Sequence, residues 1–121
     1  MESILLENKG EVAIIKLNRP EKFNSFNREM ALNLQQKLDD AAGDKKVRCI
    51  YITGAGKAFS AGQDLGELQG DNAPAMEVIL SEHYNPIVTR IRQIEKPIVC
   101  AVNEVAAGAG ANIALCADVV V

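Results

Sequence analysis

The chain has 121 residues, of which 48% are hydrophobic and 24% are charged, and its formal net charge is −3. This composition is typical of one globular domain with a real core, and it excludes a disordered chain. Positive and negative charges are mixed along the chain, which excludes the clustered basic face of a nucleic-acid-binding protein, so we expect no nucleic-acid partner.

The N-terminus and the three cysteines indicate a cytoplasmic protein. The first residues, MESILLENKGE, contain neither a basic region nor a long apolar run, so we expect no signal peptide. No stretch is long and apolar enough to span a membrane. Cys49, Cys100 and Cys116 lie in apolar surroundings without paired short spacing, so buried, reduced thiols are expected.

The first elements in chain order are a hairpin and a helix. Residues 3–9 and 11–18 are two β-rich runs on either side of Gly10, which predicts a β-hairpin. Apolar residues recur at helical spacing from about 27 to 42, with Asn27 as the capping residue and glycine at the end.

The middle of the chain predicts a strand, a loop and a long helix. Residues 47–53 (VRCIYIT) form the strand, and residues 53–65 form a loop rich in small residues. Residues 66–75 are polar and contain glycine, which indicates a mobile segment. Helical spacing then runs to about residue 95, and Pro86 is expected to kink or split this helix.

The last elements predict a parallel sheet. Residues 97–102 (PIVCAV) are nearly all apolar, which is typical of a parallel strand buried on both faces. A helix is expected from residue 108 towards 118, followed by a buried strand at 119–121. This alternation predicts an α/β fold. The apolar terminal run indicates either a sheet edge or a piece of a longer protein.

Counting excludes three glycine motifs and a catalytic triad. A phosphate-binding P-loop needs glycine where this chain has Tyr51, and serine or threonine where it has Ala58. A dinucleotide fingerprint needs glycine or alanine where it has Ile113. A nucleophile elbow around Ser60 lacks its first glycine. The only histidine, His83, has no acidic partner at triad spacing, so we expect an ordinary surface or half-buried role for it.

Two loops of small residues each follow a predicted strand directly. They are residues 54–65 (GAGKAFSAGQDL) and 103–112 (NEVAAGAGAN). Ligands of open α/β sheets bind beyond the carboxyl ends of the strands, and N–H groups from two such loops can hold one oxygen that gains negative charge. Alternatively, the small residues only permit tight packing of helix on strand, and the spacing alone leaves both interpretations open.

Several motifs together resemble the crotonase (enoyl-CoA hydratase/isomerase) superfamily over essentially the whole chain. They are NRP at 18–20 with Asn24, AFSAGQDL at 58–65, KP at 96–97, AVN at 101–103, GAG at 108–110, and Asp118. The implied fold class is α/β, a crotonase-like spiral of ββα units. Residues 1–121 are then the N-terminal portion of such a domain, without its C-terminal part.

The resemblance implies a site that binds an acyl-CoA thioester through backbone groups. In that family the thioester carbonyl lies between two backbone N–H groups, which here correspond to Gln63 and Ala109, so their side chains are expected to matter little to the chemical step. The further positions implied in substrate or CoA binding are Lys22 and Ala61 near the CoA nucleotide, Gly62, Gly108 and Gly110 around the donors, and Asp64, which is expected to hold the loop. The resemblance implies no metal or redox cofactor, and CoA is part of the substrate.

Asn112 bears on the reaction. In enoyl-CoA hydratases its position resembles a glutamate that helps to activate water, and an amide cannot take up that proton. The segments GQDL, YNPIV and AAGAGANIAL most resemble the branch that isomerises ring epoxides in phenylacetate breakdown, which implies ring-epoxide or double-bond isomerisation. The alternatives are hydration or another crotonase reaction and, outside the enzymes, a catalytically inert truncated module.

The chain departs from the family pattern in two ways. Glu104 replaces a glycine after Asn103, so we expect a less common backbone conformation there. Family members are also longer, and the additional part supplies the catalytic carboxylate, part of the acyl pocket and helices that make trimers. We therefore expect a homo-oligomer, a trimer or dimer of trimers, for the complete protein, and self-association of the 121-residue chain through uncovered apolar surface.

Overall fold

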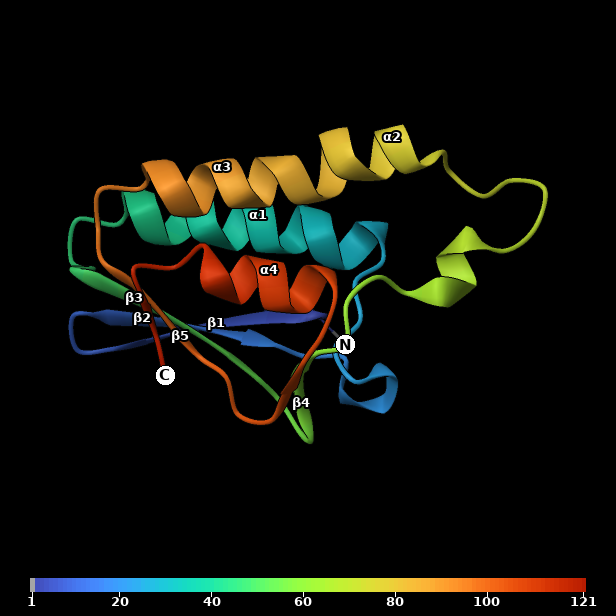
Figure 1. Cartoon of the computed structure of the whole chain (residues 1–121). Coiled ribbons are helices and arrows are strands. Elements are labelled where there is room, and N and C mark those ends of the chain that lie inside the picture. Colours follow the sequence, from blue (N-terminus) through green and yellow to red (C-terminus); the bar gives the residue numbers. More distant parts are fainter. Residues whose placement is uncertain (1) are drawn as a thin grey trace.

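The computed structural model describes residues 2–121 and contains a five-stranded sheet with helices on one face (Figure 1). Across the sheet the strands are β1 (Ile4–Lys9), β2 (Val12–Leu17), β3 (Cys49–Gly54), β5 (Ile98–Ala101) and β7 (Val119–Val120). β1 and β2 form the expected antiparallel hairpin, and the other neighbours are parallel. A second sheet pairs β4 (Ala58–Ser60) with β6 (Val105–Ala106) in parallel.

The helices pack on the same side of the large sheet, with α3 outside α1 (Figure 1). They are α1 (Arg28–Gly43), α2 (Met76–Ile79), α3 (Asn85–Gln93) and α4 (Ala109–Leu115), with 3₁₀ turns at Pro20–Lys22 and Leu65–Leu68. Asn27 caps α1 as expected, since its side chain accepts a hydrogen bond from the Met30 N–H at 2.9 Å. The apolar stripe of α1, with Leu34 and Leu38, is fully buried in the core.

Pro86 splits the long helix through a π-helical segment, Leu80–Tyr84, between α2 and α3. Proline lacks an N–H, so the carbonyl four residues earlier, that of Glu82, loses its helical donor. The side chain of Gln35 in α1 replaces that donor, because its Nε2 lies 2.8 Å from the Glu82 oxygen and 3.2 Å from the His83 oxygen. The π segment is therefore tied to α1.

Only one face of the sheet is buried, which corrects two expectations. Ile98 and Cys100 of β5 are fully buried towards the helices, but Val99 and Ala101 on the other face are half-buried. The terminal valines form an exposed edge strand, with β7 lying beside β5 alone. The prediction of burial on both faces was wrong because α1, α3 and α4 all lie on one side (Figure 1).

Three smaller expectations have mixed outcomes. Among residues 2–121, the residues other than glycine that have a positive φ are Phe23 and Asn24, so Glu104 does not have a left-handed backbone. All three cysteines are free thiols, but only Cys100 is buried, while Cys49 and Cys116 are half-buried. No helix within residues 2–121 has the length and apolar character needed to cross a membrane.

Candidate active site

The two small-residue loops meet in space through the small sheet. β4 follows β3 and β6 follows β5, so the pairing of β4 with β6 brings together the chain beyond two neighbouring parallel strands. The Ala107 N–H donates to the Ser60 carbonyl at 3.0 Å, which continues this pairing towards α4. The carboxyl ends of the strands therefore carry both segments, as the sequence predicts.

The backbone N–H of Gln63 points away from its neighbouring segment. Gln63 forms a parallel bridge with Phe26, and the bonds of this bridge are made by the flanking residues: the Phe26 N–H donates to Gly62 at 2.7 Å, and the Asp64 N–H donates to Phe26 at 2.8 Å. Successive N–H groups of an extended segment face opposite sides. Within residues 2–121 the Gln63 N–H donates to no protein group.

The backbone N–H of Ala109 is the free donor at the start of α4. The first four N–H groups of a helix have no partner within it. Here the N–H groups of Gly110 and Ala111 donate to the Ala107 carbonyl, and the Asn112 N–H donates to the Gly108 carbonyl at 3.1 Å. The Ala109 N–H has no acceptor among the described residues. Gly108 enters the helix with a φ of 53° and a ψ of −128°, a conformation that favours glycine.

Gln63 and Ala109, the residues that carry the two free donors, both line one cavity of about 470 Å³. Of the predicted site residues, the structure brings six to this cavity: Lys22, Ala61, Gln63, Asp64, Gly108 and Ala109. Asn112, one turn further along α4, lines a neighbouring cavity of about 190 Å³ together with Ala109 and Tyr84. Ala109 therefore borders both spaces, with the basic side chain of Lys22 on one side and the amide of Asn112 on the other.

Gly62 and Gly110 are not among the residues that line this cavity, and they permit close packing of the two loops. A Cβ atom on Gly110 would lie 2.5 Å from the Ser60 carbonyl oxygen and 2.6 Å from the Ser60 Cβ. A Cβ atom on Gly62 would lie 3.0 Å from the Ala107 oxygen and 3.4 Å from the Ala109 nitrogen. For these two glycines the packing interpretation holds, and that packing sets the two donor segments against each other.

Asp64 holds the donor loop, as expected. Its carboxylate lies 3.0 Å from Arg19 and accepts the Gly66 N–H at 2.8 Å. Burial alone would raise the pKa of Asp64, but the hydrogen bonds from Arg19 and Gly66 and the charges of Arg19 and Lys22 together lower this pKa below its ordinary value. Asp64 is therefore an ionised anchor that fixes the chain directly after Gln63.

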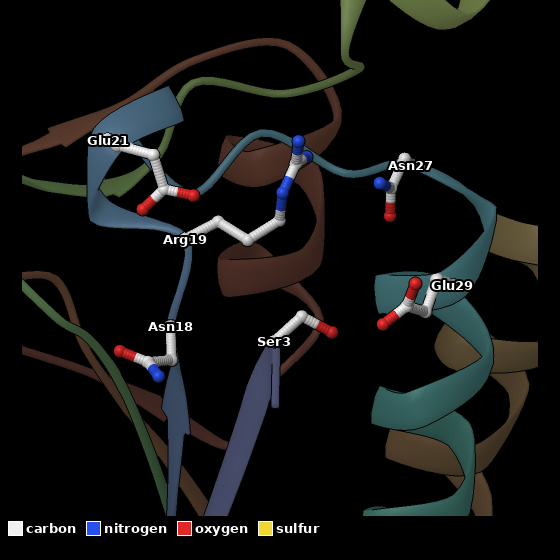
Figure 2. A pocket seen from close by; sticks show the side chains of 6 residues that line it. All are labelled: Ser3, Asn18, Arg19, Glu21, Asn27 and Glu29. Carbon is white, nitrogen blue, oxygen red and sulfur yellow. The ribbon is translucent and has the colours of Figure 1, made fainter. Parts of the chain in front are cut away.

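Arg19 also borders a separate polar cavity of about 140 Å³ on the far side of its loop. Figure 2 shows Arg19 extending between Glu21 on one side and Asn27 and Glu29 on the other. Asn27 caps α1, and Arg19 is bonded to Ser25 and Asp64, so both have structural partners. This hollow contains none of the predicted site residues.

A partly buried polar cluster around the Gln63 side chain was not predicted from the sequence. The hydroxyl of Tyr84 donates to Oε1 of Gln63, and Nε2 of Gln63 donates to Glu67 Oε1 at 2.9 Å. His83 is 1% exposed rather than superficial, and its Nδ1 lies 4.0 Å from the same Glu67 oxygen. Burial first, and then the charge of Arg28, lower the pKa of His83 against the opposing effect of Glu67. The only available signal was the proline that specifies the π segment.

Comparison with known proteins places the chain in one family. The family model described as enoyl-CoA hydratase/isomerase matches residues 7–121. The chain is 45% identical to a 1,2-epoxyphenylacetyl-CoA isomerase of Escherichia coli, over all of this chain and 47% of that protein. It is 35% identical to a crotonyl-CoA hydratase of Syntrophomonas wolfei, over 97% of this chain and 45% of that protein.

A solved structure agrees with the sequence matches. The crystal structure of an enoyl-CoA hydratase/isomerase from Mycobacterium paratuberculosis superposes with a TM-score of 0.86 at 32% identity, over 99% of this chain and 49% of that chain. The chain thus spans about half the length of the relatives it matches. From its sequence match and its fold, the chain belongs to the enoyl-CoA hydratase/isomerase family.

Proposed function

We propose that this chain provides the thioester-binding part of an acyl-CoA isomerase that works through an enolate. The observation that carries the proposal is the pair of unpartnered backbone donors, Gln63 and Ala109, on one cavity. A thioester oxygen between them accepts both N–H groups, which stabilise it as negative charge develops. Such a donor typically contributes ~3 kcal/mol to transition-state stabilisation.

The proposed reaction is a proton transfer between carbons. A carboxylate takes the proton from the carbon next to the thioester, the electron pair moves onto the thioester oxygen, and the proton returns at another carbon. The carboxylate is assigned to the additional length that the relatives have beyond this match. Because no electrons are gained or lost overall, the reaction requires no redox cofactor, and the CoA thioester is the substrate.

Asn112 and one relative favour isomerisation over hydration. The Asn112 amide borders the cavity next to Ala109, where it can orient a substrate but cannot accept a proton. The relative with 45% identity is named for the isomerisation of an epoxyphenylacetyl-CoA. We therefore propose a ring-epoxide or unsaturated CoA thioester as the substrate. Hydration is the second candidate, because another relative is named a crotonyl-CoA hydratase.

A substitution of Asn112 tests this choice in a full-length enzyme that carries these residues. Asn112→Glu introduces a proton acceptor and is expected to raise the ratio of crotonyl-CoA hydration to double-bond isomerisation. Asn112→Gln, which keeps the amide, is the matched control and is expected to leave that ratio low. If wild type and Asn112→Gln already hydrate crotonyl-CoA faster than they isomerise any thioester, the enzyme is a hydratase.

A further inference from the structure

We propose that Tyr84 is a positioning residue that holds the Gln63 N–H at the cavity by clamping the Gln63 side chain. This inference rests on the proposed function, which assigns a role in the reaction to that N–H. Tyr84 is 8% exposed, and its hydroxyl donates to Oε1 of Gln63 across 21 residues of sequence. Its ring also contacts Phe26 edge to face, with centroids 6.1 Å apart.

The chemistry of Glu67 fixes the orientation of the Gln63 amide. An ionised carboxylate only accepts hydrogen bonds, so the NH₂ end of Gln63 faces Glu67 at 2.9 Å and the carbonyl end is left for Tyr84. The other oxygen of Glu67 accepts the Arg28 N–H at 2.7 Å, at the start of α1. Both ends of the Gln63 side chain are therefore held by groups from different elements.

Tyr84 remains a hydrogen-bond donor because it stays protonated. Burial, followed by the nearby charges of Glu67 and Asp64, raises the pKa of Tyr84 above its usual range. Tyr84 also lines the second cavity, together with Ala109 and Asn112. Tyr84 therefore contacts the Gln63 side chain and also lines the cavity that Ala109 borders.

The π segment gives the clamp a rigid base. Tyr84 is the last residue of Leu80–Tyr84, which Gln35 of α1 binds through two carbonyls. π turns occur frequently at functional sites, and this one carries the two buried polar residues of the helix, His83 and Tyr84. The Gln63 N–H belongs to a loop that follows the 3-residue strand β4, and the contact of the Gln63 side chain with Tyr84 fixes its position.

The test is Tyr84→Phe in a full-length enzyme, with Tyr51→Phe as the matched control. Tyr51 is half-buried on the open face of β3, away from the cluster. For Tyr84→Phe we expect kcat for α-proton exchange to fall about tenfold with KM nearly unchanged, the size of effect that one lost hydrogen bond exerts. Hydrogen–deuterium exchange of the peptide covering residues 60–69 should also become faster.

A double variant separates positioning from general destabilisation. In a Gln63→Met background, Tyr84→Phe should cause no further loss of kcat, because the contact through which Tyr84 acts is already gone. Fully additive losses, or a Tyr84→Phe enzyme with wild-type kcat and wild-type exchange of residues 60–69, overturn the proposal. If the wild-type enzyme exchanges no α-protons, the proposed function fails, while the deuterium-exchange comparison still decides whether Tyr84 holds the loop.

Discussion

Gly110→Ala tests whether close packing on β4 constrains α4, the helix that begins at Ala109. A Cβ atom at residue 110 would approach the Ser60 carbonyl oxygen to 2.5 Å, about 0.9 Å closer than the 3.4 Å at which ordinary contact begins. The Ser60 oxygen is backbone in a buried strand, so no rotamer change relieves the overlap. α4 must therefore move away from β4.

The expected cost follows from two opposing effects. Replacing glycine by alanine inside a helix stabilises it by about 1 kcal/mol. Overpacking of a tight interior costs about 1–3 kcal/mol, and the upper end applies where backbone opposes the new atom. The free energy of unfolding should therefore fall by about 2 kcal/mol, which is the balance of these two contributions.

Gly43→Ala is the matched control for this experiment. Gly43 ends α1, and a Cβ atom there would meet nothing within 4 Å. Urea denaturation of both variants should show a lowered midpoint for Gly110→Ala and an equal or slightly raised midpoint for Gly43→Ala. If the two variants unfold at the same denaturant concentration, the overlap with Ser60 does not constrain the helix and the packing argument is refuted.

Three further predictions concern the donor, the buried histidine and the open edge. Ala109→Pro removes the N–H at a helix position that tolerates proline, and it should lower kcat at least 100-fold, whereas Ala109→Gly should not. Equal kcat values for the two variants in a steady-state assay would contradict this prediction. The pKa of His83 in the folded protein lies below 6.5, so the free energy of unfolding should decrease as the pH falls below 6.5. Chemical denaturation of His83→Gln should not show this decrease. The 121-residue chain should self-associate through the edge strand β7, and a monomer in sedimentation velocity would count against this.

Local signals allowed much of the fold to be predicted. Asn27 and the spacing of Leu34 and Leu38 identify α1, because capping and helical periodicity are visible in one segment. The short strands β4 and β6 were expected as loops, since strands of three and two residues show no periodicity. The exposed second face of the sheet was not predictable either, because the sequence of an apolar strand is similar whether one or both faces of the sheet are covered.

The candidate site, like the fold, was predictable only in part from local sequence. The segments around Gln63 and Ala109 were recognised from their motifs, and the structure brings both to one cavity. The bonds from Tyr84 and Glu67 to the Gln63 side chain join residues distant in sequence, so no local pattern reveals them. The expectation that the Gln63 side chain matters little stays a prediction, and the clamp proposed for Tyr84 predicts the opposite.

The most direct measurement of the central claim follows CoA thioesters by NMR in deuterated water with a full-length enzyme that carries these residues. We expect α-protons to exchange with solvent and double bonds to shift, while crotonyl-CoA gains water slowly or not at all. This result follows from two backbone donors on one cavity and an amide at residue 112. Rapid formation of 3-hydroxybutyryl-CoA, at a rate that rivals the exchange, would contradict it.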